Sequence, residues 1–570
     1  MRNSEEYFSI SNLKLAFFRV RCWTEKISKD QVGIRAFETS LDENCRVLSE
    51  KLLNGEWTPS RGFKFYVPKS SGTQRTKTLL FVEDAIVYQA IANLIASDHY
   101  GLLSDNDDFV YGSVLSPEVA KGEDIMAEEN PNYFFFRHWK FLYLRFIDSV
   151  KTSIETDDSR FRFETDITGF FDSIPHYCLL SMLSEKFMVD DVILDLLSDC
   201  FNVWSGTKDS MTPGVGIPQG PAPSYFFANL LLHELDDLII SHGFKYYRYM
   251  DDIKIYWYNK EELHRALVLI DNYLKGKALS INSKKTSIEE LTGDLKANSL
   301  KELERKVFSI GPSVHEEDEI SSSKPPSQNV AGQFSSMFDQ DIDDYDYSFG
   351  SELIENKEEI IEVWTKEVNE VELTIKTYFV NPKDSLELLQ IKEDVLDTDF
   401  INCSFRYFAA IKALKELEAP CEPSVEIIKY WIAPYLKYYW RASSFGLTLS
   451  LYGKNESIKS VLEDIALEPN HLYEWVQYHA IMQLSIGQEF SDKELREVYF
   501  RKLTTEPSQL IRLALYRLLF RHGQKTLITA LKKQLQKESE SYLKIQVADF
   551  NRKFGNEEID IVEFIEFIGI

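Results

Sequence analysis

The chain has 570 residues and a formal net charge of −27, with 44% hydrophobic and 27% charged residues. This length predicts several domains, because one domain usually takes about 100–200 residues. No apolar run reaches the ~18 residues of a membrane helix, and the first residues do not resemble a signal peptide, so we expect no membrane partner. The six cysteines are scattered without a C-x-x-C pair, which argues against disulfides and zinc and favours a reducing, cytoplasmic location.

The negative charge is unevenly distributed along the chain. Residues 51–80 carry six Lys or Arg and one acid, whereas residues 314–350 carry nine acids and one Lys. Proteins that bind nucleic acid usually present a basic surface, so the overall charge argues against a general nucleic-acid binder. We expect any phosphate-binding surface in the first of these two stretches.

The first expected elements are a helical segment, a basic hairpin and a helix. Residues 1–60 contain amphipathic helical runs. Residues 63–82 have the pattern of two strands around a turn that contains Pro and Gly. Apolar residues at helical spacing over residues 84–95 predict a helix that packs under the hairpin.

Four cations on this hairpin allow two interpretations. They are Lys64, Lys69, Arg75 and Lys77. One interpretation is a solvated basic hairpin. The other is a flap that holds a triphosphate. In this interpretation Arg75 makes bidentate hydrogen bonds to phosphate oxygens, and Lys69 contributes a positive charge.

A strand with an acid at its end and a Gly- and Pro-dense loop come next. Residues 163–167 predict a strand with Asp166 near its end, followed by a Gly turn and a helix. The loop at residues 214–224 lets a ligand approach the backbone closely. A flexible linker is the alternative, but the loop is followed directly by a predicted apolar helix at residues 225–235. We expect Ser224 to cap this helix.

Two adjacent carboxylates, Asp251 and Asp252, lie between two short apolar runs. The pattern predicts two β-strands joined by a tight turn with both acids at its tip. Two-metal phosphoryl transfer needs carboxylates on rigid strands that hold two ions about 3.5–4 Å apart, and Mg²⁺ prefers oxygen ligands. Asp166 and Asp251 satisfy this need, with Asp252 as a spare ligand or as support.

The remaining chain divides into three stretches. Residues 278–288 predict a strand, a turn with Lys284 and Lys285, and a second strand. Residues 313–350 are rich in acids, serine and proline and are expected to be an acidic linker. Residues 351–570 contain amphipathic stretches that predict helices, with those at residues 474–485, 508–521 and 541–553 separated by roughly 35 residues, a weak sign of HEAT or armadillo repeats.

Five motifs resemble those of prokaryotic reverse transcriptases, in order and in spacing, over residues 10–300. One motif alone would be a weak signal, but five in sequence are highly specific. The resemblance implies an α+β fold of right-hand polymerase fingers and palm, followed by an all-α, HEAT-like helical-repeat C-terminal region. The motifs are Lys69, Gly72, Arg75, Asp84 and Gln89; residues 166–172; residues 216–220 with Ser224 and Asn229; residues 248–252; and Asn282, Lys285 and Thr286.

Five domains follow from this resemblance together with the composition. Residues 1–60 would be an N-terminal helical segment. The fingers would span residues 61–165 and the palm residues 166–312, with the two interleaved. An acidic linker at residues 313–350 would lead to the α-helical repeat-like domain at residues 351–570.

The resemblance also implies the catalytic and metal-binding residues. Asp166, Asp251, Asp252 and Lys285 would be catalytic, with Lys285 as a proton donor to pyrophosphate. Two Mg²⁺ ions, or Mn²⁺ in their place, would be held by Asp166, Asp251, Asp252 and the carbonyl group of Ile167.

Six residues would bind the dNTP by the same resemblance. Phe171 stands at the position of the family's steric gate, where a bulky ring collides with the 2′-OH that distinguishes ribonucleotides. Gln219 and Gly220 would line the nascent base pair. Tyr225 departs from the family, in which Pro often follows the Ser, and this leaves the start of its helix open. The substrate-binding set is Lys69, Arg75, Phe170, Phe171, Gln219 and Gly220.

The branch of the family is indicated by the second half of the chain. The helical C-terminal half, the lack of a nuclease region and the aromatic stretch at residues 133–141 resemble the abortive-infection and defence-associated reverse transcriptases of bacteria. A retron-like or orphan enzyme is the alternative. Some members of the defence branch work without a template, are primed by a protein side chain and form oligomers.

The expected function is a reverse-transcriptase-like DNA polymerase in antiphage defence. Its partners would be dNTPs, RNA or single-stranded DNA, and further copies of the chain bound through the helical domain. The alternative is a polymerase-fold scaffold or sensor that does not need catalysis and recruits partners through the helical domain. The net charge of −27 favours this alternative, because a cleft that holds a duplex should be basic.

Overall fold

The computed structural model describes most of the chain. It covers residues 2–310, 357–378 and 454–538, apart from 26–28, 70, 105, 107, 157–158 and 470, together with single positions between 407 and 449 and between 543 and 547. The acidic linker predicted at residues 313–350 lies outside the described residues.

The chain divides into two compact units. The first contains Met1–Lys64 and Lys77–Asn329, and the second contains Phe65–Thr76 and Val330–Ile570. The outer part of the basic hairpin therefore groups with the C-terminal part of the chain. This division does not test the predicted domain limits, which remain predictions.

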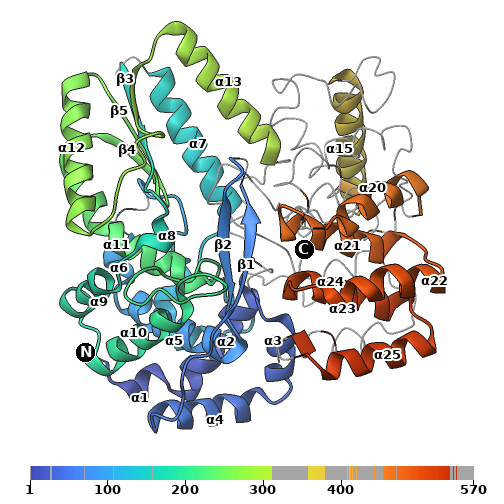
Figure 1. The fold of residues 1–570 in the computed structure, drawn as a ribbon. Coiled ribbons are helices and arrows are strands. Elements are labelled where there is room, and N and C mark those ends of the chain that lie inside the picture. Colours follow the sequence, from blue (N-terminus) through green and yellow to red (C-terminus); the bar gives the residue numbers. More distant parts are fainter. Residues whose placement is uncertain are drawn as a thin grey trace. The chain divides into compact units, whose positions relative to one another are not determined.

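The first unit contains a four-stranded antiparallel sheet. In spatial order its strands are β4 (Lys245–Tyr249), β5 (Asp252–Trp257), β3 (Phe161–Thr165) and β6 (Ser287–Glu290). Helix α12 (Lys260–Gly276) packs against β3, β5 and β6, and helix α7 (Trp139–Glu155) packs against β4. Figure 1 shows α12 on one side of the sheet and α7 on the other.

Side chains of β3 alternate between the core and a charged face. Phe163 and Thr165 are buried, whereas Arg162 and Glu164 are more exposed, as the two-residue period of a strand requires. The register places Glu164 opposite Lys254 of β5, and the Lys254 Nζ donates to Glu164 Oε1 over 2.7 Å. The charged face thus continues across the strands toward the turn between β4 and β5.

Two apolar helices form the core beside the sheet. Helix α5 (Val82–Asp98) confirms the helix expected at residues 84–95, and it packs against α2 (Ile10–Cys22) and α11 (Ala222–Ser241). Both α5 and α11 are buried nearly all round, as is typical of helices inside a core. The other helices of the unit are α1 Ser4–Tyr7, α3 Gln31–Glu38, α4 Leu41–Leu53, α6 Tyr100–Ser104, η2 Pro117–Ala127, α8 Phe170–Ser173, α9 His176–Glu185, α10 Asp191–Trp204 and α13 Gly293–Ile310.

The expected cap of α11 was wrong. The helix begins at Ala222, with Pro221 as its N-cap, so Ser224 lies inside the first turn. Proline has no N–H to leave unpaired and its φ suits a helix start, which lets the Pro-rich loop begin the helix three residues early. The hydroxyl of Ser224 lies 3.2 Å from that of Tyr88. The doubt about the helix start at Tyr225 is thereby removed.

The second unit combines the outer part of the hairpin with helices. The hairpin strands are β1 (Phe63–Pro68) and β2 (Gln74–Leu79). The helices expected at residues 474–485 and 508–521 are confirmed as α21 (Glu474–Gly487) and α24 (Gln509–His522), which pack against each other. A HEAT-like repeat is not confirmed, and most of a third expected helix at residues 541–553 lies outside the described residues. The other helices are α15 Lys357–Tyr378, α20 Glu456–Leu467, α22 Asp492–Glu494, the π-helix η6 Leu495–Phe500, α23 Arg501–Thr505 and α25 Lys525–Gln536.

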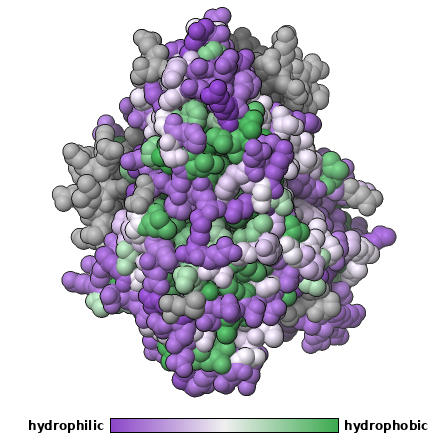
Figure 2. Space-filling view, turned by 90° about the vertical axis from the view of Figure 1, so that its left-hand side faces the viewer, coloured by the Kyte–Doolittle hydropathy of each residue, from purple (hydrophilic) through white to green (hydrophobic). Residues whose placement is uncertain are grey.

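The surface carries both hydrophilic and hydrophobic residues. On the face drawn in Figure 2 hydrophilic residues predominate, and hydrophobic residues form separate groups between them. Among the helices of the described ranges, none combines the length and apolar character needed to cross a bilayer.

Candidate active site

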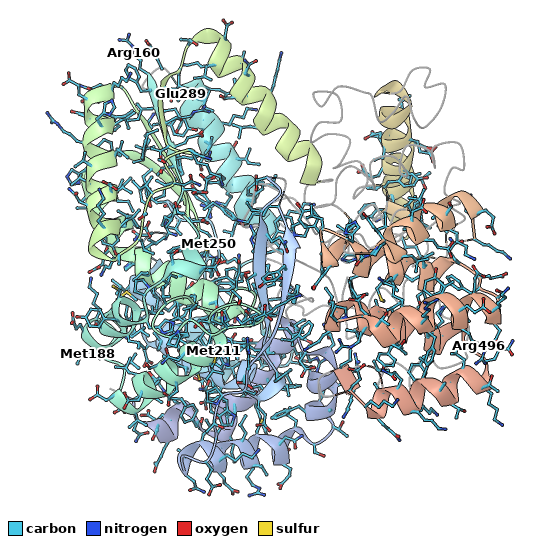
Figure 3. All side chains as sticks on the ribbon, in the orientation of Figure 1. Arg160, Met188, Met211, Met250, Glu289 and Arg496 are labelled. Carbon is cyan, nitrogen blue, oxygen red and sulfur yellow. The ribbon has the colours of Figure 1, made fainter. Side chains whose placement is uncertain are left out.

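The predicted carboxylates lie at one end of the two central strands of the sheet, β3 and β5. These strands are antiparallel, with Thr165 paired to Ile253 as the last pair at this end. Asp166 follows Thr165 directly, and Asp252 precedes Ile253, so the two acids are neighbours across the two strands. Asp251 stands one residue further, in the turn. Figure 3 labels Met250 near this end of the strands and Arg160 and Glu289 at their opposite end.

The turn between β4 and β5 is as tight as the sequence predicts. Tyr249 pairs with Asp252, so that only Met250 and Asp251 lie between the strands. Met250 has φ 52° and is fully buried. Positive φ is unusual for a residue with a side chain and is typical of two-residue hairpins. The turn therefore needs support from its surroundings.

Gly112 supplies part of that support by its lack of a side chain. A Cβ atom at Gly112 would lie 2.6 Å from the backbone nitrogen of Met250. The backbone of residue 112 can therefore pack directly against the turn. The carbonyl oxygen of Gly112 also accepts a hydrogen bond of 2.8 Å from Asn229 Nδ2.

A buried ion pair between Arg248 and Asp236 also supports the turn between β4 and β5. Arg248 and Asp236 are each about 1% exposed and their side chains join through two hydrogen bonds of 2.7 and 2.6 Å. Arg248 Nη1 also donates to the carbonyl oxygen of Met250 over 2.8 Å and to Asn229 over 2.9 Å. Burial alone would lower the pKa of Arg248, but the charge of Asp236 and its hydrogen bonds raise that pKa above its usual value. The guanidinium thus stays charged and fixes the turn.

Asp166 has one paired and one unpaired carboxylate oxygen. Oδ2 accepts a 2.7 Å hydrogen bond from Lys285 Nζ. Oδ1 is buried and has no hydrogen-bond partner in the parts of the chain that the structure describes. A buried acceptor without a partner costs about 1–3 kcal/mol, so this oxygen is suited to a ligand. A divalent cation fits it, because Mg²⁺ takes carboxylate oxygens and keeps several waters.

The backbone around Asp166 leaves a further oxygen available. The N–H of Thr168 donates to Ser280 O, and the N–H of Asn282 donates to Asp166 O. Ile167 pairs with Ile281 between these two bonds. Residues of such a non-hydrogen-bonded pair direct their own carbonyl groups away from each other, so the carbonyl of Ile167 is directed away from Ile281. This geometry is compatible with its predicted role as a backbone ligand.

Asp252 shares a lysine with Glu164. Lys254 Nζ lies 3.8 Å from Asp252 Oδ2 as well as 2.7 Å from Glu164 Oε1. Burial lowers the pKa of Lys254, but Asp252 and Glu164 raise it above its ordinary value. Asp252 therefore faces a permanent cation from the protein. Among the described residues no three His, Cys, Asp or Glu side chains already form a closed metal cluster, so the ligand roles of Asp166, Asp251, Asp252 and Ile167 remain predictions.

The predicted steric gate lies in the short helix that follows Asp166. Gly169, with φ 53°, is the N-cap of α8. Phe171 is 5% exposed, and its ring contacts the rings of Phe170 at 5.8 Å and Tyr225 at 5.1 Å between centroids. The N–H of Ile217 donates to the carbonyl of Phe171 over 2.9 Å, which ties the gate to the Pro-Gln-Gly loop.

The Pro-Gln-Gly loop is held from two other elements. The N–H of Thr78 on β2 donates to the carbonyl of Gln219 over 2.8 Å. Trp23 Nε1 donates to the carbonyl of Gly220 over 2.9 Å. The loop is thus a fixed part of the first unit, and a flexible linker is excluded as the interpretation of these residues.

Three of the four hairpin cations are buried, so the solvated-hairpin interpretation was wrong for them. Lys64 is 6%, Lys77 1% and Arg75 8% exposed. Lys64 donates to Thr78 Oγ1 and to the carbonyl of Trp204, and burial lowers its pKa to about 8. Lys69 and Arg75 belong to the second unit and the carboxylates to the first, so their contact with a triphosphate remains a prediction.

Several residues with structural roles at the site were missed from the sequence, namely Trp23, Glu25, Gly112 and Asp236. Asp236 lies seven residues after Asn229 on α11, which places both on one helix face; an acid on that apolar face was a usable signal. Glu25 Oε1 accepts a hydrogen bond of 2.7 Å from Lys77 Nζ, and no sequence pattern around Glu25 predicts this contact.

Comparison with known proteins agrees with the motifs. Residues 115–314 match the family described as reverse transcriptase (RNA-dependent DNA polymerase). The chain contains a reverse transcriptase domain. The matched range includes Asp166, Phe171, Gln219, Asp251 and Lys285, whereas the basic hairpin precedes it.

One relative and two solved structures show more distant similarity. An uncharacterized 91 kDa protein in the cob intron of Schizosaccharomyces pombe is 39% identical over 77 residues, which are 13% of this chain and 9% of that protein. The chain thus spans less than a tenth of this relative.

A structure of telomerase from Candida albicans in complex with a TWJ fragment of telomeric RNA has 13% identity and a TM-score of 0.31. The match covers 72% of this chain and 61% of that one. Apo telomerase from Candida tropicalis has 10% identity and a TM-score of 0.29, over 90% of this chain and 69% of that one. Scores this low do not bear on the activity of this chain.

Proposed function

We propose that the chain is an RNA-directed DNA polymerase that adds dNTPs to a growing strand by two-metal phosphoryl transfer. The observation that carries this proposal is the buried Oδ1 of Asp166, which has no hydrogen-bond partner among the described residues and lies beside Asp252 at one end of the central strands, within the reverse transcriptase domain. Such an arrangement gives a divalent cation oxygen ligands on rigid strands.

The site residues have distinct roles in this proposal. Asp166, Asp251, Asp252 and the carbonyl of Ile167 would hold two Mg²⁺ ions, for which Mn²⁺ could substitute. When bound, the ions stabilise charge on the attacking and leaving oxygens. Lys285, which contacts Asp166 through Nζ, donates a proton to the departing pyrophosphate.

The dNTP is bound by residues around the carboxylates. Phe171, supported by Phe170, excludes the 2′-OH of a ribonucleotide. Gln219 and Gly220 line the nascent base pair on a loop that three hydrogen bonds hold in place. Arg75 and Lys69 bind the triphosphate, and RNA or single-stranded DNA serves as the template.

The direct test is Mg²⁺-dependent incorporation of labelled dNTP by purified full-length chain. Asp166→Asn and Asp251→Asn should each lower kcat by at least about a thousandfold, which corresponds to ~4 kcal/mol of lost transition-state stabilisation. Asp271→Asn, which removes a charge that pairs with Lys275 within α12, should retain activity. Chelation of Mg²⁺ should abolish incorporation, and added Mn²⁺ should restore it. Retained activity in Asp251→Asn would contradict the two-metal assignment.

We place this activity in the cytoplasm, in bacterial antiphage defence. The helical C-terminal half and the acidic stretch before the helices support this role. Cells that express the Asp251→Ala, Asp252→Ala chain should lose protection in a plaque assay. Full protection by that variant would rule out catalysis as the means of defence. Light scattering of the purified chain would test for oligomers formed through the helical domain.

The second candidate is a scaffold or sensor that recruits partners through its helices. The net charge of −27 favours it, because a duplex-binding cleft should be basic. Protein that incorporates no nucleotide with RNA or DNA templates, with or without primer, in Mg²⁺ and Mn²⁺ would support this candidate. Mass spectrometry for a covalently attached nucleotide would show whether the chain primes itself.

A further inference from the structure

The ring of Tyr225 lies directly behind the proposed sugar gate. Tyr225 is fully buried in α11, and its ring meets Phe171 in an edge-to-face contact, with 5.1 Å between centroids and 76° between planes. Such contacts have a preferred geometry and stabilise one relative orientation of the two rings. Phe171 therefore cannot move back from an incoming sugar unless Tyr225 also moves.

The hydroxyl of Tyr225 is anchored to a buried ion pair. It donates to Glu25 Oε2 over 2.9 Å, while Glu25 Oε1 accepts from Lys77 Nζ over 2.7 Å. The side chains of Lys77 and Glu25 are 1% and 4% exposed. Hydrogen bonds to a buried charge are stronger than neutral ones, so Glu25 and Lys77 hold the far end of the tyrosine ring.

Both partners of Tyr225 come from segments that also hold the Pro-Gln-Gly loop. Glu25 lies two residues after Trp23, whose indole donates to the carbonyl of Gly220. Lys77 precedes Thr78, whose N–H donates to the carbonyl of Gln219. The ring of Trp23 also packs against that of Tyr225, at 5.7 Å between centroids. The Pro-Gln-Gly loop and the steric gate Phe171 are thus both held by the segments that contain Trp23, Glu25 and Lys77.

We propose that Tyr225, held by Glu25 and Lys77, is a positioning residue that fixes Phe171 against the 2′-OH and thereby sets the preference for dNTP over rNTP. This inference rests on the proposed polymerase function and on Phe171 as its sugar gate. A purely packing role would need only the ring of Tyr225, whereas the positioning role needs its hydroxyl. The substitution Tyr225→Phe distinguishes the two roles, because it keeps the ring and removes the hydroxyl.

The test compares Tyr225→Phe with wild type in the full-length chain. The measured quantity is kcat/KM for dNTP divided by kcat/KM for the matching rNTP. We expect this ratio to fall roughly tenfold, equivalent to about 1.4 kcal/mol, mainly through a lower KM for rNTP while kcat for dNTP changes little. An unchanged ratio in an active variant overturns the proposal.

Tyr88→Phe is the matched control. It also removes a buried hydroxyl beside α11, 3.2 Å from Ser224 Oγ. The ring of Tyr88, however, packs against Phe227 and Trp204. The ratio of kcat/KM for dNTP to kcat/KM for rNTP in Tyr88→Phe should stay within about twofold of wild type, because this substitution removes no hydrogen bond to Tyr225, Glu25 or Lys77. An equal loss in Tyr88→Phe overturns the specific role of Tyr225.

Two further variants keep the outcome unambiguous. Glu25→Gln keeps the size of the side chain but weakens the anchor, so it should also lower the ratio; if Tyr225→Phe fails to fold in a thermal melt, this variant decides. Phe171→Ala must admit rNTP if Phe171 is the gate. A wild type that incorporates no dNTP, or an unchanged ratio in Phe171→Ala, refutes the proposed function or its gate. If the ratio changes in Phe171→Ala but not in Tyr225→Phe or Glu25→Gln, the role of Tyr225 is refuted and the proposed function stands.

Discussion

At Gly112, a hydrogen atom occupies the place where any other residue would carry a Cβ atom. That position lies 2.6 Å from the backbone nitrogen of Met250, closer than non-bonded heavy atoms pack. The constraint comes from a contact between segments about 140 residues apart in sequence. At the scale of single residues, the carboxylate turn is thus shaped by residues outside its own motif.

Gly112→Ala should displace the turn that carries Asp251. Overpacking of this kind typically costs about 1–3 kcal/mol, and we expect a lower melting temperature together with at least a roughly tenfold loss of dNTP incorporation, since small misplacements of reacting groups are expensive. The control is Gly101→Ala, where an added Cβ meets no atom within 4 Å. Wild-type activity in Gly112→Ala would show that the turn tolerates this shift.

At the scale of elements, α5 is fixed to its neighbours by a buried acid in its first turn. Asp84 is 2% exposed. It accepts hydrogen bonds from Ser60 N over 2.8 Å and from Trp204 Nε1 of α10 over 3.1 Å. Burial raises the pKa of Asp84 to about 6, although these hydrogen bonds oppose the shift. The carboxyl joins three segments but is costly to ionise.

This raised pKa makes stability depend on pH with a definite sign. The native state holds the proton more tightly than the unfolded chain, whose Asp pKa is near 3.9. The contribution of Asp84 is therefore greatest below about pH 4 and is lost as pH rises through about 6. Asp84→Asn, which keeps the acceptor oxygen, should be more stable than wild type by about 1–3 kcal/mol at pH 7. The difference should vanish near pH 4 in thermal melts, and a constant difference over this range would contradict the assignment.

At the scale of the whole molecule, the outer hairpin belongs to the same compact unit as the C-terminal helices. Within this unit the ring of Trp475 stacks on that of Phe65 at 5.8 Å, and Tyr473 OH donates to the carbonyl of Gly72 over 2.9 Å. Gly72 lies between Lys69 and Arg75, the residues proposed to bind the triphosphate. The helical half of the chain thus contributes to the shape of the proposed nucleotide flap.

Tyr473→Phe should loosen this hold on the hairpin. One hydrogen bond contributes about 0.5–1.5 kcal/mol, so we expect KM for dNTP to rise roughly threefold while kcat changes less than twofold, the pattern of lost substrate binding. Leu472→Ala, at a side chain that is 77% exposed, is the control and should behave as wild type. If KM stays constant in Tyr473→Phe, the helices do not act on nucleotide binding through this contact.

Much of the fold was predictable from local patterns. The helices at residues 84–95, 474–485 and 508–521 and the β4–β5 turn are marked by periodicity and by turn residues, signals that act over a few positions. The start of α11 was not predictable in this way, because Pro221 and Pro223 allow the helix to begin at Ala222, three residues before the expected start at Tyr225. The repeat architecture of the C-terminal half was not confirmed, since spacing alone does not define how helices stack.

The reverse transcriptase domain could be recognised from the sequence, and its catalytic carboxylates could be predicted there, because both depend on motifs whose residues lie close together in the chain. The contacts that hold these residues in place became visible with the fold. The Arg248–Asp236 pair, the close approach of Gly112 to Met250 and the Tyr225–Glu25–Lys77 cluster join segments from about 12 to 200 residues apart. Burial makes such contacts strong and selective, and burial is a property of the folded chain.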